Sequence, residues 1–135
     1  MIDNEMKKKL IEMADKAREH SYVPYSHYPV GAALLTKSGE IFTGCNIENS
    51  SFPVTVCGER CAIFKAVSEG FREFEAIAIV TNNGGSPCGS CRQVMCEFST
   101  GMEVICADND HKITIDQTAL ELLPGAFTPE SLQVL

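Results

Sequence analysis

The sequence contains VCGERC at residues 56–61 and SPCGSCRQ at residues 86–93, and each stretch stands where a turn leads into apolar residues at helical spacing. That spacing predicts helices over 57–68 and 88–98. Unpaired backbone N–H groups and the positive end of the helix dipole favour a thiolate over a thiol at such a position. We therefore expect three thiolates at two helix N-termini, from Cys57, Cys88 and Cys91.

The rest of the chain alternates between strand and helix patterns. An apolar hairpin turns at Ser38-Gly39, and helices alternate with strands beyond it, which favours an α/β fold with a mixed five-stranded sheet covered on both faces. A chain of 135 residues is expected to form a single domain over 1–135. The further elements are expected as a helix over 3–19, a hairpin over 30–47, strands over 75–81, 102–108 and 111–115, and a last helix over 116–123.

The composition argues against two classes of partner. A formal net charge of -7 leaves no basic face for a nucleic-acid backbone, so a nucleic-acid substrate is disfavoured. No stretch approaches the 18 or so consecutive apolar residues of a membrane span. The first residues, MIDNEMKKKLIEM, mix acids and bases where a signal peptide needs an apolar core, so a cytoplasmic protein is expected.

The seven cysteines indicate a metal site more than a disulfide framework, because their number is odd and no export signal accompanies them. Three thiolates make a tetrahedral zinc site with one position left for water, and a zinc with three protein ligands is typical of a catalytic site. We expect one zinc ion per chain. The other cysteines lie beside apolar residues and are expected to pack as small hydrophobic side chains: Cys45, Cys61, Cys96 and Cys106.

Two charged residues follow the first thiol directly. Glu59 comes two residues after Cys57, close enough to take a proton from water and pass it on, so it is the candidate general acid–base. Three thiolates around one zinc ion leave a net negative cluster. Arg60 is the candidate residue to offset this negative charge, because a guanidinium can donate hydrogen bonds to ligand sulfurs and withdraw their electron density.

Simpler interpretations stand beside this one. The Cys-x-x-Cys at Cys88 and Cys91 could be a redox pair, although its position in the chain is unusual for one. Cys61, four residues after Cys57, could close a four-thiolate structural zinc site. Glu59 by itself is typical of a solvated acid in the first turn of a helix. A non-catalytic zinc-binding or redox module therefore remains the alternative from another functional class.

The general signature of zinc nucleobase deaminases is His-x-Glu followed by Pro-Cys-x-x-Cys, and this chain has the variant in which a third cysteine replaces the histidine. Along nearly its full length, the chain further resembles the small homotetrameric cytidine deaminases. The matching runs are PYSHYPVGAALLT, GCNIENSSF, CGERCAIFKAVSEG, SPCGSCRQV and ELLPGAF. The resemblance implies a three-layer α/β/α fold, one zinc ion per chain, and hydrolysis of cytidine and 2′-deoxycytidine to the uridines and ammonia.

The resemblance also implies roles for particular residues. Asn46 and Glu48 would bind the ribose 3′-hydroxyl, although NIEN at a strand end could simply form a turn. The backbone N–H of Gly58 would hold the base O2, and the Ser86 carbonyl would accept from the amine. Phe127 of the GAF run would reach the base in a neighbouring subunit, so the resemblance implies a homo-oligomer, a tetramer, with shared sites.

The chain departs from the family pattern at four positions. Tyr28 replaces a common Phe near the sugar and base, and Phe52 replaces a Tyr that meets the ribose 5′ side from a neighbouring subunit. Gly58 and Ser90 each replace an Ala beside the zinc ligands. Because these departures surround the substrate, the alternative substrate is a modified aminonucleoside, either blasticidin-like or an N4-substituted cytidine.

Overall fold

A five-stranded sheet in the order β2-β1-β3-β4-β5 forms the centre of the computed structural model, which describes residues 1–132. Strand β3 pairs with β4 in parallel, and the other three neighbouring pairs in the described sheet are antiparallel, so the predicted mixed sheet is confirmed. The strands are β1 (Gly31–Thr36), β2 (Ile41–Cys45), β3 (Phe74–Val80), β4 (Glu103–Ala107) and β5 (Ile113–Thr118).

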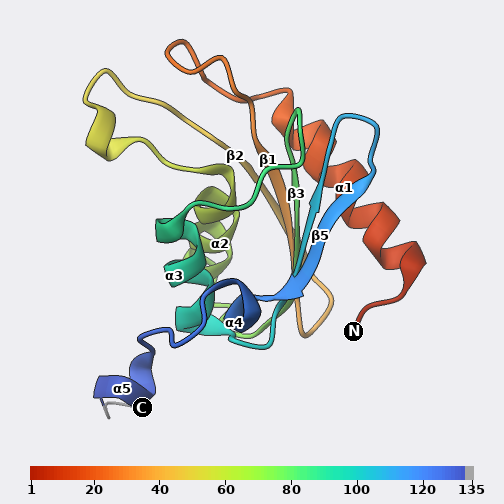
Figure 1. The fold of residues 1–135 in the computed structure, drawn as a ribbon, viewed down its shortest axis with the longest axis vertical. Coiled ribbons are helices and arrows are strands. Elements are labelled where there is room, and N and C mark those ends of the chain that lie inside the picture. The colour runs from red at the N-terminus through yellow and green to blue at the C-terminus, as the bar shows by residue number, and fades with distance from the viewer. Residues whose placement is uncertain (133–135) are drawn as a thin grey trace.

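Helices cover both faces of the sheet, which gives the three layers that the sequence predicts (Figure 1). Helix α1 lies on one face, and α2, α3 and α4 lie on the other. None of the helices in residues 1–132 is long and apolar enough to cross a membrane. The helices are α1 (Asn4–Arg18), α2 (Gly58–Ser68), α3 (Gly89–Phe98), α4 (Ala119–Leu122) and α5 (Pro129–Leu132), with a 3₁₀ turn, η1, at Phe52–Val54.

Small residues allow α1 to approach its face of the sheet closely. Ala33, Ala76 and Ala78 are fully buried there beneath Leu10 and other apolar residues of α1. Gly31 is needed at the beginning of β1, since a Cβ built on it would lie 1.9 Å from the backbone oxygen of Ala14. No neighbouring backbone can yield that far, so only glycine fits at this contact.

The opposite face carries a larger core, in which Leu34, Ile77 and Ile79 pack beneath Ile63 of α2 and Met95 of α3. All five side chains are fully buried or nearly so. This packing fixes α2 and α3 side by side on the sheet. Their N-termini consequently lie on the same face of the sheet, towards the end at which β2 and β3 finish (Figure 1).

Most predicted elements are confirmed within one or two residues, but the predicted boundary between the last strand and helix is wrong. The strand was expected over 111–115 and the helix over 116–123, whereas β5 continues to Thr118 and α4 has four residues. The antiparallel ladder with β4 extends through Asp116, opposite Ile105. Thr118 then caps α4 in a capping box with Glu121, which is a helix start signal. The sequence analysis also missed η1 and α5.

Candidate metal centre

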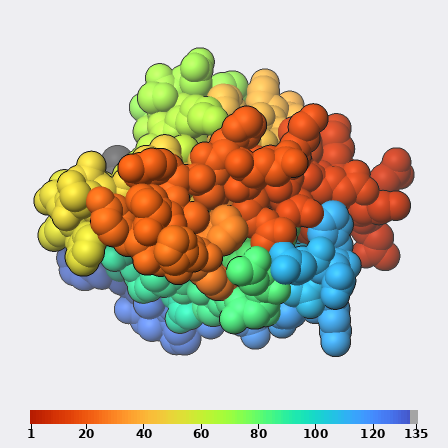
Figure 2. Space-filling view, turned by 90° about the horizontal axis from the view of Figure 1, so that it is seen from above, coloured from red at the N-terminus to blue at the C-terminus, as the bar shows by residue number. Residues whose placement is uncertain are grey.

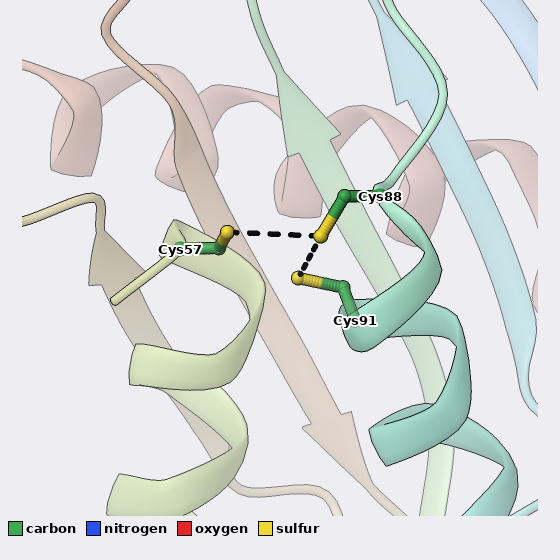
Figure 3. Close-up of side chains that lie close together, drawn as sticks. All are labelled: Cys57, Cys88 and Cys91. Atoms are coloured by element: carbon green, nitrogen blue, oxygen red, sulfur yellow. Dashed lines mark hydrogen bonds between the residues drawn. The ribbon is translucent and has the colours of Figure 1, made fainter. Parts of the chain in front are cut away.

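Three cysteine side chains converge at the N-termini of α2 and α3, as the sequence predicts (Figure 3). Cys57 is the N-cap residue of α2, Cys88 is the N-cap residue of α3, and Cys91 lies in the first turn of α3. The Sγ atoms of Cys57 and Cys88 are 3.9 Å apart, and those of Cys88 and Cys91 are 3.5 Å apart. Within residues 1–132, these thiols form the one group of three or more candidate metal ligands.

The spacing of these sulfur atoms fits a zinc ion. Four ligands arranged tetrahedrally at the usual Zn–S distance of about 2.3 Å lie about 3.8 Å from one another. The Sγ–Sγ separations of 3.5 and 3.9 Å bracket that value. Cys61 lies outside the group, so the described residues offer three thiolates rather than a closed set of four. The triad of Cys57, Cys88 and Cys91 therefore binds zinc and leaves one position without a protein ligand.

The surroundings of the triad favour a thiolate at Cys57. A hydrogen bond from the Cys91 thiol and the Arg60 guanidinium lower the pKa of Cys57 to about 5, although burial opposes the shift. The Arg60 guanidinium donates to Cys57 Sγ over 3.1 Å. The pKa of Cys91 is raised by its hydrogen bond to Cys57 and by burial, so in the metal-free triad the first proton leaves from Cys57.

Glu59 lies in the first turn of α2, and its side chain is directed inward rather than into solvent. The residue is 4% exposed, which excludes the solvated first-turn acid. Burial raises the pKa of the Glu59 carboxyl, and the neighbouring Cys57 adds to the shift. A buried carboxyl group with a raised pKa beside a metal site suits general acid–base chemistry.

A cavity of about 280 Å³ opens beside the triad. Its walls come from segments far apart in the chain, which lie next to one another at the end of the molecule seen in Figure 2. The volume is close to the lower limit for small-molecule sites. The cavity is lined by Ser26, Tyr28, Val30, Asn46, Glu48, Thr55, Cys57, Glu59, Ile79, Thr81, Gly85, Ser86 and Cys88.

Asn46 and Glu48 line the cavity and also hold its rim together. The Asn46 side-chain amide accepts from the Val30 N–H at 2.9 Å and donates to the Tyr28 carbonyl at 2.8 Å. The Glu48 carboxylate accepts from the backbone N–H of Tyr25 at 3.0 Å and also from the Ser26 hydroxyl. NIEN is therefore more than a local turn, because both side chains tie the segment before β1 to the end of β2.

Gly58 and Ser86 lie beside the zinc-binding cysteines, and of the two only Ser86 is among the residues that line the cavity. Gly58 is the first residue of α2, where its N–H has no partner within the helix. A Cβ on Gly58 would lie 2.9 Å from the Val30 carbonyl oxygen, which explains why this chain has no side chain there. Ser86 lies in the loop before Cys88 and lines the cavity.

The sequence analysis did not identify Arg92 as part of the site. Its guanidinium donates to the Pro87 carbonyl at 2.8 Å, to the Ser86 hydroxyl, and to the Leu122 carbonyl at 3.1 Å. Arg92 thus fixes the loop that leads into Cys88. The sequence did contain a signal for this role. An arginine directly after Cys91, near the start of a helix, has a side chain long enough to donate hydrogen bonds to the preceding loop.

The structure does not bring Phe52 or Phe127 into the cavity of their own chain. Phe52 is 66% exposed and lines a separate hollow with Tyr25, where the two rings meet edge to face. Phe127 is 56% exposed, and its carbonyl accepts from the Gln93 side chain at 2.8 Å. Both aromatic rings therefore face outward from the single chain.

The remaining cysteines follow the prediction in part. Cys96 and Cys106 are buried, and burial raises the pKa of Cys106 to about 12, so it stays a neutral thiol. Cys45 and Cys61 are only half-buried, because β2 is an edge strand and Cys61 lies on the flank of α2. Ser90 is exposed on the first turn of α3 and does not line the cavity.

A larger hollow of about 860 Å³ lies at the other end of the sheet, between Phe74 and the C-terminal segment. It contains none of the three clustered thiols and neither Glu59 nor Arg60. Its acids, Glu75, Glu97 and Glu130, are not part of any candidate metal group in the described chain. The chemistry is therefore assigned to the smaller cavity.

The sequence and the fold around the three cysteines are similar to those of known proteins. Residues 4–107 match the family described as the cytidine and deoxycytidylate deaminase zinc-binding region. A cytidine deaminase of Sporosarcina psychrophila is 52% identical over 126 residues, covering 92% of this chain and 93% of that protein. A cytidine deaminase crystal structure from Burkholderia pseudomallei has a TM-score of 0.86 at 45% identity, covering 89% of this chain and 98% of that chain. A blasticidin-S deaminase of Bacillus cereus is 33% identical over 129 residues, covering 88% of this chain and 90% of that protein.

Proposed function

The chain belongs to the family of zinc-binding cytidine and deoxycytidylate deaminases, and from that membership we propose that it hydrolyses cytidine and 2′-deoxycytidine to uridine, 2′-deoxyuridine and ammonia. As a cytidine deaminase, it is a hydrolase. The observation that carries the proposal is the buried Glu59 carboxyl beside a three-thiolate metal site, in a cavity that suits a small ligand. A redox pair needs neither this third thiol nor this buried acid.

The proposed reaction needs an activated water and a carrier of protons. Cys57, Cys88 and Cys91 would hold the zinc ion, which would supply the first by lowering the pKa of water toward neutrality. Glu59 accepts the water proton and passes it to ring N3 while the water oxygen bonds to C4. Glu59 then carries the proton of the new C4 hydroxyl to the amino nitrogen, the C4–N bond breaks as the C4 carbonyl forms, and ammonia leaves.

The cavity walls orient the nucleoside for this reaction. The Gly58 N–H donates to the base O2, and the Ser86 carbonyl accepts from the 4-amino group. Asn46 and Glu48 bind the ribose 3′-hydroxyl, and Tyr28 forms a wall beside the sugar and base. The presence of Tyr28, Asn46, Glu48 and Ser86 in the lining of one cavity supports these roles.

An absorbance assay tests the proposal, because loss of the 4-amino group changes the cytosine chromophore. Zinc-loaded protein should consume cytidine and 2′-deoxycytidine and release one ammonia for each. Failure to consume either nucleoside would sink the proposal. A nucleotide should be a poor substrate, since the described cavity lining contains carboxylates and no Lys or Arg to hold a 5′-phosphate.

A second candidate substrate class is a modified aminonucleoside, blasticidin-like or N4-substituted. The similarity to a blasticidin-S deaminase and the departure at Tyr28, which lines the cavity, favour its inclusion. The higher identity to cytidine deaminases places cytidine first. Parallel kcat/KM measurements on cytidine, blasticidin S and N4-methylcytidine decide between the two classes.

We further propose that the chain forms a homotetramer in which Phe52 and Phe127 complete neighbouring sites. Their exposed rings support this arrangement, since large aromatic side chains left uncovered in a single chain indicate a contact surface. Light scattering should give a mass near four chains. When Glu59→Gln protein and Phe127→Ala protein are mixed and allowed to exchange subunits, activity should return. Some sites in the mixed tetramers then combine Glu59 from one chain with Phe127 from the other. Active protein at the mass of one chain would exclude the arrangement.

A further inference from the structure

Tyr28 crosses from one wall of the cavity to the other. Its backbone end is fixed beside the expected ribose site, where its carbonyl accepts from Asn46 and its N–H donates to the Ser26 hydroxyl at 3.1 Å. At the other end, its phenolic hydroxyl donates to the Asn83 side-chain oxygen over 2.6 Å. The side chain therefore joins the segment before β1 to the loop that follows β3.

The loop that receives the Tyr28 hydroxyl leads directly to the metal centre. The Thr81 hydroxyl donates to the same Asn83 oxygen at 3.4 Å and accepts from the Gly85 N–H at 3.0 Å. A Cβ on Gly85 would lie 2.9 Å from the Tyr28 hydroxyl oxygen, so the phenol rests against the loop backbone. Ser86 follows Gly85 directly, and its carbonyl is the expected acceptor for the 4-amino group.

These contacts determine how far the Ser86 side of the cavity can move away from the base. Asn46 holds the backbone of Tyr28, and the tyrosine ring is rigid. The loop after β3, which is bonded to the Tyr28 hydroxyl, is therefore held at a fixed distance from the segment before β1 that borders the expected ribose site. Without the hydroxyl, the loop keeps its attachments to Arg92 at Ser86 and Pro87 and to Thr114 at Gly84, but it loses the one bond that ties it to Tyr28. The space beside the 4-amino group then becomes adaptable.

We propose that the Tyr28 hydroxyl and Asn83 form a positioning pair that makes the site selective for an unsubstituted 4-amino group. This inference rests on the proposed deaminase function. Asn83 itself does not line the cavity, so it acts through Tyr28 and Gly85 and not by contact with substrate. The pair excludes an N4-alkyl group because a fixed Ser86 carbonyl leaves no room for the additional carbon.

The test is a double-mutant cycle with Tyr28→Phe, Asn83→Ala and both changes together. The measured quantity is the ratio of kcat/KM for cytidine to that for N4-methylcytidine, whose hydrolysis yields uridine and methylamine. Each single change should lower this ratio about three- to tenfold, the effect of one hydrogen bond. The double change should lower it no further than one single change, because both remove the same contact.

Two further variants separate positioning from general loss of structure. Asn83→Asp keeps an oxygen acceptor for the phenol and should retain the wild-type ratio. Tyr22→Phe removes a phenolic hydroxyl from an exposed tyrosine that does not line the cavity and should also leave the ratio unchanged. Zinc content and the unfolding temperature are measured for every variant, so that a ratio is compared only between folded, metal-loaded proteins.

The outcomes are distinct. If wild-type protein deaminates cytidine but Tyr28→Phe and Asn83→Ala keep its ratio, the positioning pair is wrong and the proposed function stands. Additive effects in the double variant would also overturn the pair, because the two residues would then act separately. Wild-type protein that consumes neither nucleoside overturns the proposed function and this inference with it.

Discussion

The Arg60 guanidinium donates a hydrogen bond to Cys57 Sγ over 3.1 Å, so a positive charge lies against one sulfur of the metal triad. Arg60→Gln removes that charge while leaving the three thiols in place. Activity on cytidine should fall about 10–100-fold, because more electron-rich thiolates weaken zinc as a Lewis acid. Steady-state kinetics on zinc-quantified protein checks this. Full activity in the variant would show that Arg60 serves only to pack the end of α2.

Glu59→Gln tests the proton carrier. The amide keeps the size of the carboxyl and is not needed to hold zinc, so metal content should remain near one per chain. Turnover should fall by at least about 10²–10⁴-fold, because neither proton transfer then has its carrier. Glu69→Gln, at the exposed end of α2, is the matched control and should retain activity. Near-normal turnover in Glu59→Gln would refute the assignment.

The thiols should show their different proton affinities once zinc is removed. Cys57, with a pKa of about 5, is mostly thiolate at pH 6, whereas burial raises the pKa of Cys45. Iodoacetamide at pH 6 should therefore modify Cys57 before Cys45 in chelator-treated protein. Zinc-loaded protein should be protected at Cys57. Peptide mass spectrometry identifies the modified residue, and equal rates for the two thiols would contradict the prediction.

Lys7 pairs with two carboxylates that join α1 to the sheet, at 2.7 Å from Asp116 and 3.2 Å from Glu103. Lys7→Met leaves the buried Glu103 carboxylate without its cation and should cost on the order of 3 kcal/mol of unfolding free energy at pH 7. Urea unfolding checks the value. Lys9→Met, on the exposed side of the same helix, should change stability little.

The cost of Lys7→Met should also depend on pH. Burial alone would raise the pKa of Asp116, but the hydrogen bond from the Lys7 ammonium and its positive charge hold the pKa below its usual value. A carboxylate with a lowered pKa contributes stability above its unfolded pKa, and that contribution is lost as the pH falls through the folded pKa. The difference between wild type and variant should therefore be largest near neutrality and narrow as the pH falls below about 3.8. A constant difference would show that packing, not charge, is lost.

Gly31→Ala should be among the most damaging single-methyl changes in this chain. Its Cβ would lie 1.9 Å from the Ala14 oxygen, so α1 must move away from β1. Overpacking of this kind costs about 1–3 kcal/mol or more. Gly101→Ala is the matched control, because a Cβ there meets nothing within 4 Å. Thermal unfolding compares the two, and an unchanged midpoint in Gly31→Ala would contradict the close approach of α1.

The elements that could be predicted from the sequence are those whose cause lies in the local pattern. Apolar spacing and a leading cysteine located α2 and α3 because helix periodicity and an N-terminus are both local signals. The end of β5 depends instead on pairing between Asp116 and Ile105, a contact formed only in the sheet. The pattern from Asp116 onward also suits a helix, so local information alone placed the boundary too early.

The same distinction applies to the candidate site. The three thiols and Glu59 were accessible to sequence reasoning because zinc chemistry restricts both residue type and spacing. The bond between the Tyr28 hydroxyl and Asn83 was not, since it joins residues 55 positions apart through a loop without regular structure. Phe127 lies outside the cavity of its own chain, so its proposed role depends on a surface that only another copy can supply.

The parallel pairing of β3 with β4 has a consequence for how folding and metal binding are coupled. Parallel strands need a crossover, here α3, and the chain must close that long connection before the pairing can form. Cys88 and Cys91 lie on the crossover, whereas Cys57 precedes β3, so the three thiols come from segments on either side of this strand. Zinc bound by all three thiolates therefore links the segment before β3 to the crossover after it, so metal binding adds to the stability of the assembled sheet.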